Sequence, residues 1–207
     1  MASDGKTPLK NNSFGVVIVN GQNNTIGGLD PGSGNAIAFS GAAGVYLAPD
    51  GSNNTASSIN NRILSNSIYG RGPGIMLGTD GPHQNDNLDA DEGMNHLQNF
   101  PVITSTTLFS SSFLVEGTLN STPNTEFTIQ LFDDGRDYRN PTRTFLKTIT
   151  ATTDNNGDAH FSTAVPAGIS STRPRPIRRA TLPSFSCARQ IVAIFQLARG
   201  LNREITR

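Results

Sequence analysis

A short motif recurs three times in the first hundred residues of this 207-residue chain. In each copy a glycine precedes a run with apolar residues at alternate positions, and a turn follows. The copies are GVVIVNG from Gly15, GVYLAPDG from Gly44 and GIMLGTDG from Gly74, so they begin 29 and 30 residues apart. A period of this size predicts a repeat architecture, in which each unit buries its apolar side against the next.

The composition selects among repeat architectures. The chain has 21 Gly and is rich in Asn, Ser and Thr, which are all poor helix formers. No segment keeps a 3.6-residue apolar period for three turns, and no regular leucine frame is present. We therefore expect an all-β chain whose residues 15–99 form a short parallel β-helix of two to three coils. Asn suits its turns, because a short amide tolerates left-handed backbone.

A second pattern begins at residue 100. Five strand-like segments follow each other at intervals of about 12–16 residues, separated by Ser, Pro, Asn, Asp and Gly turn signals. They are FPVITSTTLF, SFLVEGTLNS, TEFTIQLFDD, RTFLKTITATTD and GDAHFSTAV. Asn156-Gly157 is the strongest hairpin signal among the turns. Residues 100–170 are thus predicted to form an antiparallel β-sandwich.

Several phrases of the sequence resemble one protein family. NNTIGG, GSGNAI, NRILSNSI, GPGIMLGTDG, NDNLDADEG and LQNFPVI look like the last coils of bacterial right-handed parallel β-helix repeat proteins, some of which carry the motif called CSLREA. The resemblance covers about residues 12–168. It implies that the β-helix is right-handed, that an Ig-like β-sandwich follows it, and that the parent protein is secreted or attached to the cell surface. Residues 1–14 are expected to be a disordered N-terminus.

The C-terminal residues 171–207 differ in charge from the rest of the chain. They hold eight Arg and one Glu, whereas residues 1–170 hold 8 Lys+Arg and 15 Asp+Glu. In the resembled family a strand such as ATATDPSGNTSEF follows the last hairpin. One DNA sequence that encodes this phrase gives RPRPIRRATLPS when it is translated in the frame shifted by one base. That string is residues 173–184 of this chain. We therefore interpret residues 171–207 as a frameshifted, aberrant or disordered tail, which leaves the sandwich one strand short.

The basic tail and its neighbours also allow other interpretations. Arginine clusters bind phosphates, but no aromatic residues interleave with these arginines and no recognition motif is present, so no nucleic-acid partner is expected. The later run QIVAIFQLARGLNR is compatible with a short helix.

An acidic loop joins the two predicted modules. It contains Asp80, Asp86, Asp89, Asp91 and Glu92. Carboxylates at alternate positions resemble a Ca²⁺ loop, because hard oxygen ligands then converge on one ion. The position of the invariant EF-hand glycine holds Glu92, however, and the alternative is a solvated crossover between modules. If a metal binds, the predicted ligands are Asp86, Asp89 and Asp91; no other cofactor is expected.

The sequence contains no clear catalytic constellation. His83, His96 and His160 are scattered, and there is no G-x-S-x-G nucleophile motif. Some polysaccharide-degrading enzymes also have right-handed β-helices, and among them the galacturonases carry Asn-Thr-Asp, Asp-Asp, Gly-His-Gly and Arg-Ile-Lys motifs. The first, third and fourth are absent here, and the one Asp-Asp pair lies in the second module. Glycosidases require two carboxylates that flank a sugar. We expect no catalytic residues.

These observations lead to two functional hypotheses. The first is a non-catalytic, structural or adhesive part of a bacterial secreted or cell-surface protein that contacts polysaccharide or surface matrix. The alternative is a remnant of a carbohydrate-active β-helix, either a polysaccharide lyase or a glycoside hydrolase. The sequence has no run of about 18 apolar residues, so no membrane span is predicted. The first residues do not form the apolar core of a signal peptide.

Overall fold

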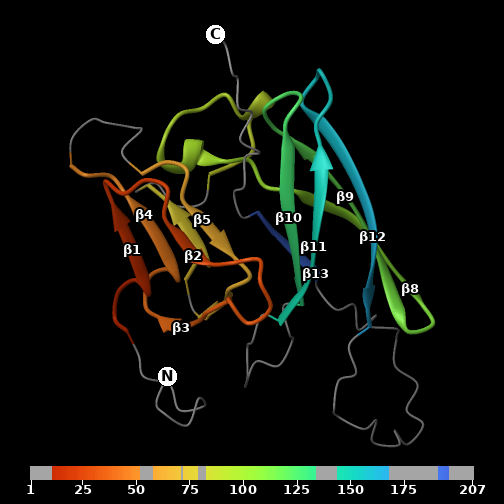
Figure 1. Cartoon of the computed structure of the whole chain (residues 1–207), viewed down its shortest axis with the longest axis horizontal. Helices are drawn as coiled ribbons and strands as arrows, with labels where there is room; N and C mark the ends of the chain where they lie inside the picture. Colours follow the sequence, from red (N-terminus) through yellow and green to blue (C-terminus); the bar gives the residue numbers. More distant parts are fainter. Residues whose placement is uncertain are drawn as a thin grey trace, which may run out of the picture.

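The computed structural model describes residues 11–51, 58–70, 72–78, 83–133, 144–167 and 191–195. Within these ranges the regular structure consists of β-strands and two short 3₁₀ segments, η1 (Asn87–Asp89) and η2 (Met94–Leu97). The all-β prediction is confirmed. In Figure 1 the strands form two groups that lie side by side, and the loop that carries η1 and η2 joins them.

The first group contains seven short strands arranged in three small parallel sheets. Their order is β1–β4–β7, β2–β5 and β3–β6, so neighbours in each sheet come from successive repeats. The strands are β1 (Val16–Val19), β2 (Thr25–Gly27), β3 (Ala36–Ser40), β4 (Val45–Ala48), β5 (Arg62–Leu64), β6 (Ser67–Gly70) and β7 (Ile75–Leu77).

The sequence motifs stack in the predicted register. Val16 pairs with Val45, and Val45 pairs with Ile75, as expected from the 29- and 30-residue spacing. Val45 and Leu47 of the middle repeat are 0% exposed and pack in one apolar cluster with Met94 of η2. Full burial of each aliphatic side chain stabilises the fold by about 1.5–3 kcal/mol. The apolar side of the middle repeat is thus covered by its neighbours, whereas Val16 and Ile75 of the outer repeats are only partly buried.

Buried asparagines link the repeats through their side chains. The Asn61 Oδ1 accepts hydrogen bonds from the backbone N and the Nδ2 of Asn24, at 3.1 and 2.9 Å. Its Nδ2 donates to the Gly21 carbonyl at 2.8 Å. In the next layer the Asn95 amide accepts from the Asn61 N–H and donates to the Asn61 carbonyl. Each amide therefore holds the backbone of the preceding layer.

A second asparagine position repeats this arrangement. The Asn66 Oδ1 accepts from the backbone N and Nδ2 of Asn35, and its Nδ2 donates to the Ile26 carbonyl. Several turn asparagines also have positive φ, among them Asn20 at 50° and Asn60 at 57°. The expected use of Asn in left-handed turns is confirmed.

The second group contains two antiparallel sheets, with the orders β12–β9–β8 and β11–β10–β13. All five strands predicted between residues 100 and 170 are confirmed. The strands of this group are β8 (Val102–Phe109), β9 (Ser112–Asn120), β10 (Glu126–Asp133), β11 (Thr144–Thr152), β12 (Asp158–Pro166) and β13 (Ile191–Phe195).

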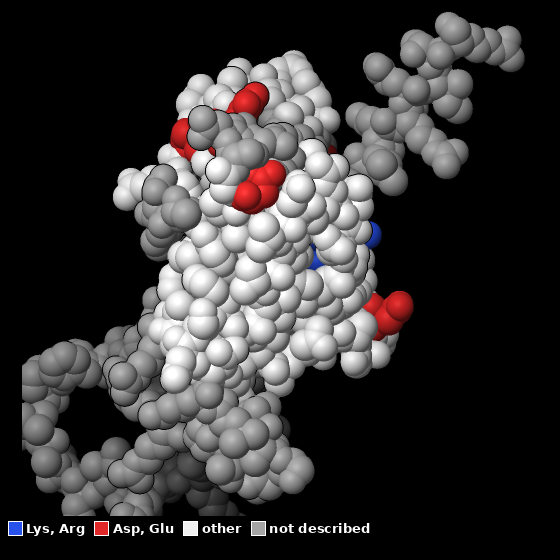
Figure 2. Space-filling model, turned by 90° about the vertical axis from the view of Figure 1, so that its left-hand side faces the viewer, with Lys and Arg blue, Asp and Glu red and all other residues white. Residues whose placement is uncertain are grey.

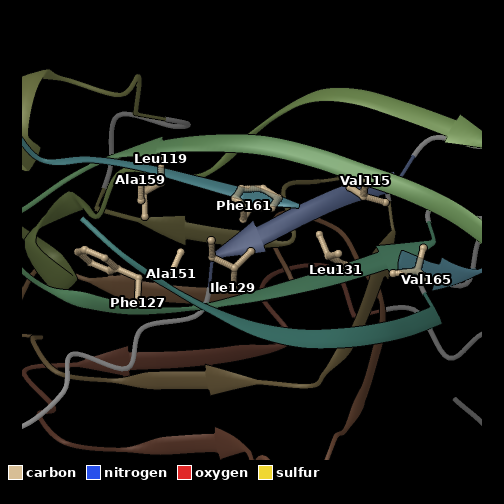
Figure 3. Packing of buried hydrophobic residues seen from close by; sticks show 9 residues of the cluster. All are labelled: Val115, Leu119, Phe127, Ile129, Leu131, Ala151, Ala159, Phe161 and Val165. Atoms are coloured by element: carbon tan, nitrogen blue, oxygen red, sulfur yellow. The ribbon is translucent and has the colours of Figure 1, made fainter. Parts of the chain in front are cut away.

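One apolar core lies between the two antiparallel sheets. Figure 3 shows side chains of β9 and β12 directed toward those of β10 and β11. Val115, Ile129 and Leu131 are 0% exposed, and Phe127 is 1% exposed. These residues occupy alternate positions, because successive side chains of a strand point to opposite faces.

Strand β10 is buried on both faces and joins the two groups. Gln130 points away from the core of Figure 3 and is 0% exposed. Its Oε1 accepts from the Ser65 N–H at 2.8 Å, and its Nε2 donates to the hydroxyls of Ser65 and Thr148 at 3.0 Å each. Ser65 lies in the turn between β5 and β6, so this amide fixes the parallel sheets against the antiparallel ones.

The tail and the N-terminus require two corrections. Residues 191–195 form strand β13, which pairs antiparallel with β10, where the sequence suggested a short helix. Pairing with an available strand edge outweighs a weak local helix preference. At the other end, Asn11 bridges Ser40 and Phe14 stacks on Tyr46, so the expected disorder does not extend to residues 11–14. Residues 1–10 and the rest of the predicted aberrant tail lie outside the described residues.

The asparagine stack generates a stability prediction. Asn61→Ala leaves the N–H and the side-chain amide of Asn24 and the Gly21 carbonyl without their partner, and it should lower the free energy of unfolding by about 2–4 kcal/mol. Urea denaturation followed by circular dichroism measures the change. Asn12→Ala, at an exposed asparagine whose side chain makes no hydrogen bond to a described residue, is the control and should cost less than about 0.5 kcal/mol. Equal losses in both variants would contradict the role of the stack.

The β11–β12 turn generates a pH prediction. Hydrogen bonds from the Asp158 N–H and then the Asn156 N–H lower the pKa of Asp154. The ionised carboxylate therefore stabilises the fold at pH values above the ordinary carboxyl pKa, and this contribution disappears as the pH falls through the lowered value. Thermal melts should show Asp154→Asn less stable than wild type at pH 7, with the difference closing in acid. A stability difference of equal size at pH 7 and in acid would contradict this role of the Asp154 carboxylate.

Candidate functional site

The three predicted metal ligands converge in the loop between the two groups of strands. One carboxylate oxygen from each of Asp86, Asp89 and Asp91 lies within 4.8 Å of the others. The residue pattern Asp-x-x-Asp-x-Asp produces this cluster because the backbone curls tightly around η1. Leu88 and Asp89 both have left-handed backbone, with φ of 65° and 57°. The three acids that the sequence spacing singled out thus lie close together, and their binding of a metal stays a prediction.

Asp86 organises the start of the loop. Its Oδ2 accepts hydrogen bonds from the backbone N–H groups of Ala90 and Asp91, at 3.0 and 3.2 Å. A short carboxylate that bonds backbone N–H groups a few residues ahead is a common way to close such a turn. The bonds use one oxygen of Asp86 and leave Oδ1 for another partner.

Asp89 connects the loop with the antiparallel sheets. It is 8% exposed, and its Oδ1 accepts from the Asn99 N–H at 2.7 Å. Its Oδ2 accepts from the Gln98 Nε2 at 2.9 Å and from the Ser121 hydroxyl at 3.0 Å. Ser121 directly follows β9, so one carboxylate holds both the loop and the antiparallel part.

Sequence reasoning missed the residues that complete this junction. Asn99 donates through Nδ2 to the carbonyls of Asp86 and Asn120, at 2.7 and 2.9 Å. The Asn120 side chain accepts from the Leu88 N–H at 2.8 Å. The available signal was the polar pair Gln98-Asn99 inside the otherwise apolar phrase LQNFPV, since buried amides need bonding partners.

The surroundings of Asp91 disfavour its ionised form. Burial, followed by the carboxylates of Asp86 and Asp89, raises the pKa of Asp91 above its ordinary value, while His83 acts in the opposite direction. Both causes disfavour the ionised form. Three carboxylates held this closely therefore repel each other, and a nearby positive charge would relieve that repulsion.

The remaining residues singled out in the sequence do not extend the cluster. His83 lies 2.7 Å from the Leu77 carbonyl through Nε2, so its ring supports the end of β7. Glu92 is exposed, and His96 lies in η2. Asp80 lies outside the described residues.

A hollow on the antiparallel sheet holds the third histidine. Its volume is about 310 Å³, and its lining consists of Thr104, Glu116, Gly117, His160, Phe161 and Ser162. Its lining includes one carboxylate, that of Glu116, which accepts a hydrogen bond from the Ser105 hydroxyl at 2.7 Å. A glycosidase requires a pair of carboxylates, and the lining of this hollow does not supply one.

No model of a known protein family matches the chain, and no curated protein matches it either. The described part of the chain contains no helix with the length and apolar character needed to cross a bilayer. The resemblance to bacterial β-helix repeat proteins therefore depends on the sequence motifs alone.

The junction generates a stability prediction that is independent of metal. Asp89→Ala removes the acceptor for the Asn99 N–H, the Gln98 amide and the Ser121 hydroxyl, and it should cost about 2–4 kcal/mol in the presence of a chelator. Urea denaturation measures the loss. Glu92→Ala, at the exposed acid three residues away, should change stability by less than about 0.5 kcal/mol. An unchanged Asp89→Ala variant would refute the structural role of this carboxylate.

Proposed function

We propose that the chain is a non-catalytic scaffold from a bacterial secreted or cell-surface protein. In this proposal the three parallel sheets are the coils of a short right-handed β-helix, and the two antiparallel sheets are an Ig-like sandwich that follows it. Support comes from the parallel stacking of successive repeats and from the sequence phrases that resemble the family. The scaffold presents the outer face of its coils to polysaccharide or surface matrix.

The observation that carries this function is the chemistry of the outer face of β1–β4–β7. Val17, Tyr46 and Met76 are neighbours in register across this sheet, and Phe14 stacks on Tyr46 with ring centroids 4.3 Å apart. Val17 and Val19 are 47% and 55% exposed. Exposed apolar positions that lie together, with an aromatic ring among them, are typical of contact surfaces.

The charge distribution supports contact rather than catalysis. Among the described residues on the β1 side of the molecule, most of the surface in Figure 2 is uncharged, and the charged side chains lie at one end and along one edge. The outward positions of the β1–β4–β7 sheet, Val17, Tyr46 and Met76, carry no carboxylate. A polysaccharide-cleaving groove would place paired acids along such a sheet.

A binding experiment tests this proposal. The whole chain is applied to immobilised pectin, alginate, cellulose, chitin and peptidoglycan, and bound protein is quantified. We expect retention on at least one polymer, weakened at least about tenfold in Val17→Ser/Val19→Ser, because the apolar contact area is lost. Ser162→Ala in the hollow of the antiparallel sheet is the control and should bind as wild type.

The same samples distinguish the alternative function. Release of reducing ends or unsaturated uronates from any of these polymers, above that of a heat-denatured sample, would contradict a non-catalytic scaffold. Absence of retention on every polymer would contradict the polysaccharide contact.

A further inference from the structure

The junction loop contains buried acceptor oxygens that have no hydrogen-bond donor. They are Asp86 Oδ1, Asp91 Oδ1 and Gln98 Oε1. In folded proteins roughly nine in ten buried polar atoms are hydrogen-bonded, so three unpaired acceptors in one loop require an explanation. Gln98 is 8% exposed, and the Nε2 of the same carboxamide donates to the Asp89 Oδ2 at 2.9 Å. All three atoms carry negative partial or full charge.

The arrangement of the three carboxylates fits one hard cation. Oxygens bound to the same Ca²⁺ at about 2.3–2.6 Å lie at most about 5 Å apart. The ligand atoms offered by Asp86, Asp89 and Asp91 lie within 4.8 Å of one another and meet this limit. The bonds that Asp89 accepts do not exclude a cation, because each carboxylate oxygen has two lone pairs.

We propose that Asp86, Asp89 and Asp91 bind one Ca²⁺ ion at the junction between the parallel and antiparallel sheets. Asp86 and Asp91 each keep one carboxylate oxygen, Oδ1, that accepts no hydrogen bond and is available to a cation. Asp89 supplies the third carboxylate. Ca²⁺ accepts six to eight oxygen ligands in flexible geometry, which suits an irregular loop better than the strict octahedron of Mg²⁺. This site is independent of the proposed contact with polysaccharide.

The ion would stabilise both parts of the molecule at once. Asp89 holds Ser121 at the end of β9, and the same loop continues to Asn95, which bonds the Asn61 backbone of the coil stack. Ca²⁺ binds the folded loop and not the unfolded chain, so its binding energy adds to the stability of the fold.

Titration calorimetry on the whole chain, stripped with EGTA, tests the proposal. We expect one Ca²⁺ to bind per chain and Mg²⁺ to bind more weakly. In thermal melts, a Ca²⁺ concentration one hundred times the Kd should raise the Tm by about 5–10 °C. Asp86→Asn/Asp91→Asn should weaken binding at least tenfold. Asp154→Asn, an exposed acid in the β11–β12 turn, is the matched control and should bind as wild type.

Hydrogen exchange of the wild-type protein locates the ion without any substitution. Ca²⁺ should slow exchange at the amides of Ala90, Asp91 and Asn99. A chain that shows neither heat nor a Tm shift with Ca²⁺ overturns the proposal. Protection confined to another segment, or full binding by the double variant, overturns the assignment of these three ligands.

Discussion

The buried amide of Asn61 holds together elements on which the rest of the molecule depends. It bonds backward to Asn24 and Gly21, and the backbone of Asn61 in turn bonds the amide of Asn95 in the junction loop. An amide can donate and accept at once, so it can satisfy both an N–H and a carbonyl of the preceding layer, where a carboxylate could only accept. Without these bonds, the turns that position the short parallel strands would contain unpaired polar groups away from water.

A continuous chain of polar contacts extends from this stack to the antiparallel sheets. Asn95 is followed closely by Gln98 and Asn99, which bond Asp89 and the end of β9. A second link is Gln130, which lies in the buried middle of β10 and whose amide bonds Ser65. The two groups of strands are therefore joined by polar links, while each has its own apolar cluster. The acidic loop lies in this junction, which is why a cation there would act on the whole molecule.

Much of the fold could be read from local pattern. The alternation in GVVIVNG, GVYLAPDG and GIMLGTDG placed β1, β4 and β7, and their spacing supplied the register that the structure has. The five later strands followed from the same period of two and from turn residues. The cluster of Asp86, Asp89 and Asp91 was also foreseen, because acids at such spacing converge once the loop curls.

Long-range partners could not be read in this way. The pairing of β13 with β10 depends on an edge that exists only after the sheets form, and local preference suggested a helix there instead. The roles of Gln98, Gln130 and Ser121 depend on contacts between residues far apart in the chain.

The sequence by itself determined the strand positions, the repeat register and the acidic character of the loop, because these follow from side-chain periodicity and composition. The tertiary structure alone decided which amides are buried, which carboxylate oxygens lack donors, and which strand pairs with the edge of β10. Those properties depend on the distance between groups that only packing brings together, and a hydrogen bond or an ion site exists only within a few ångströms.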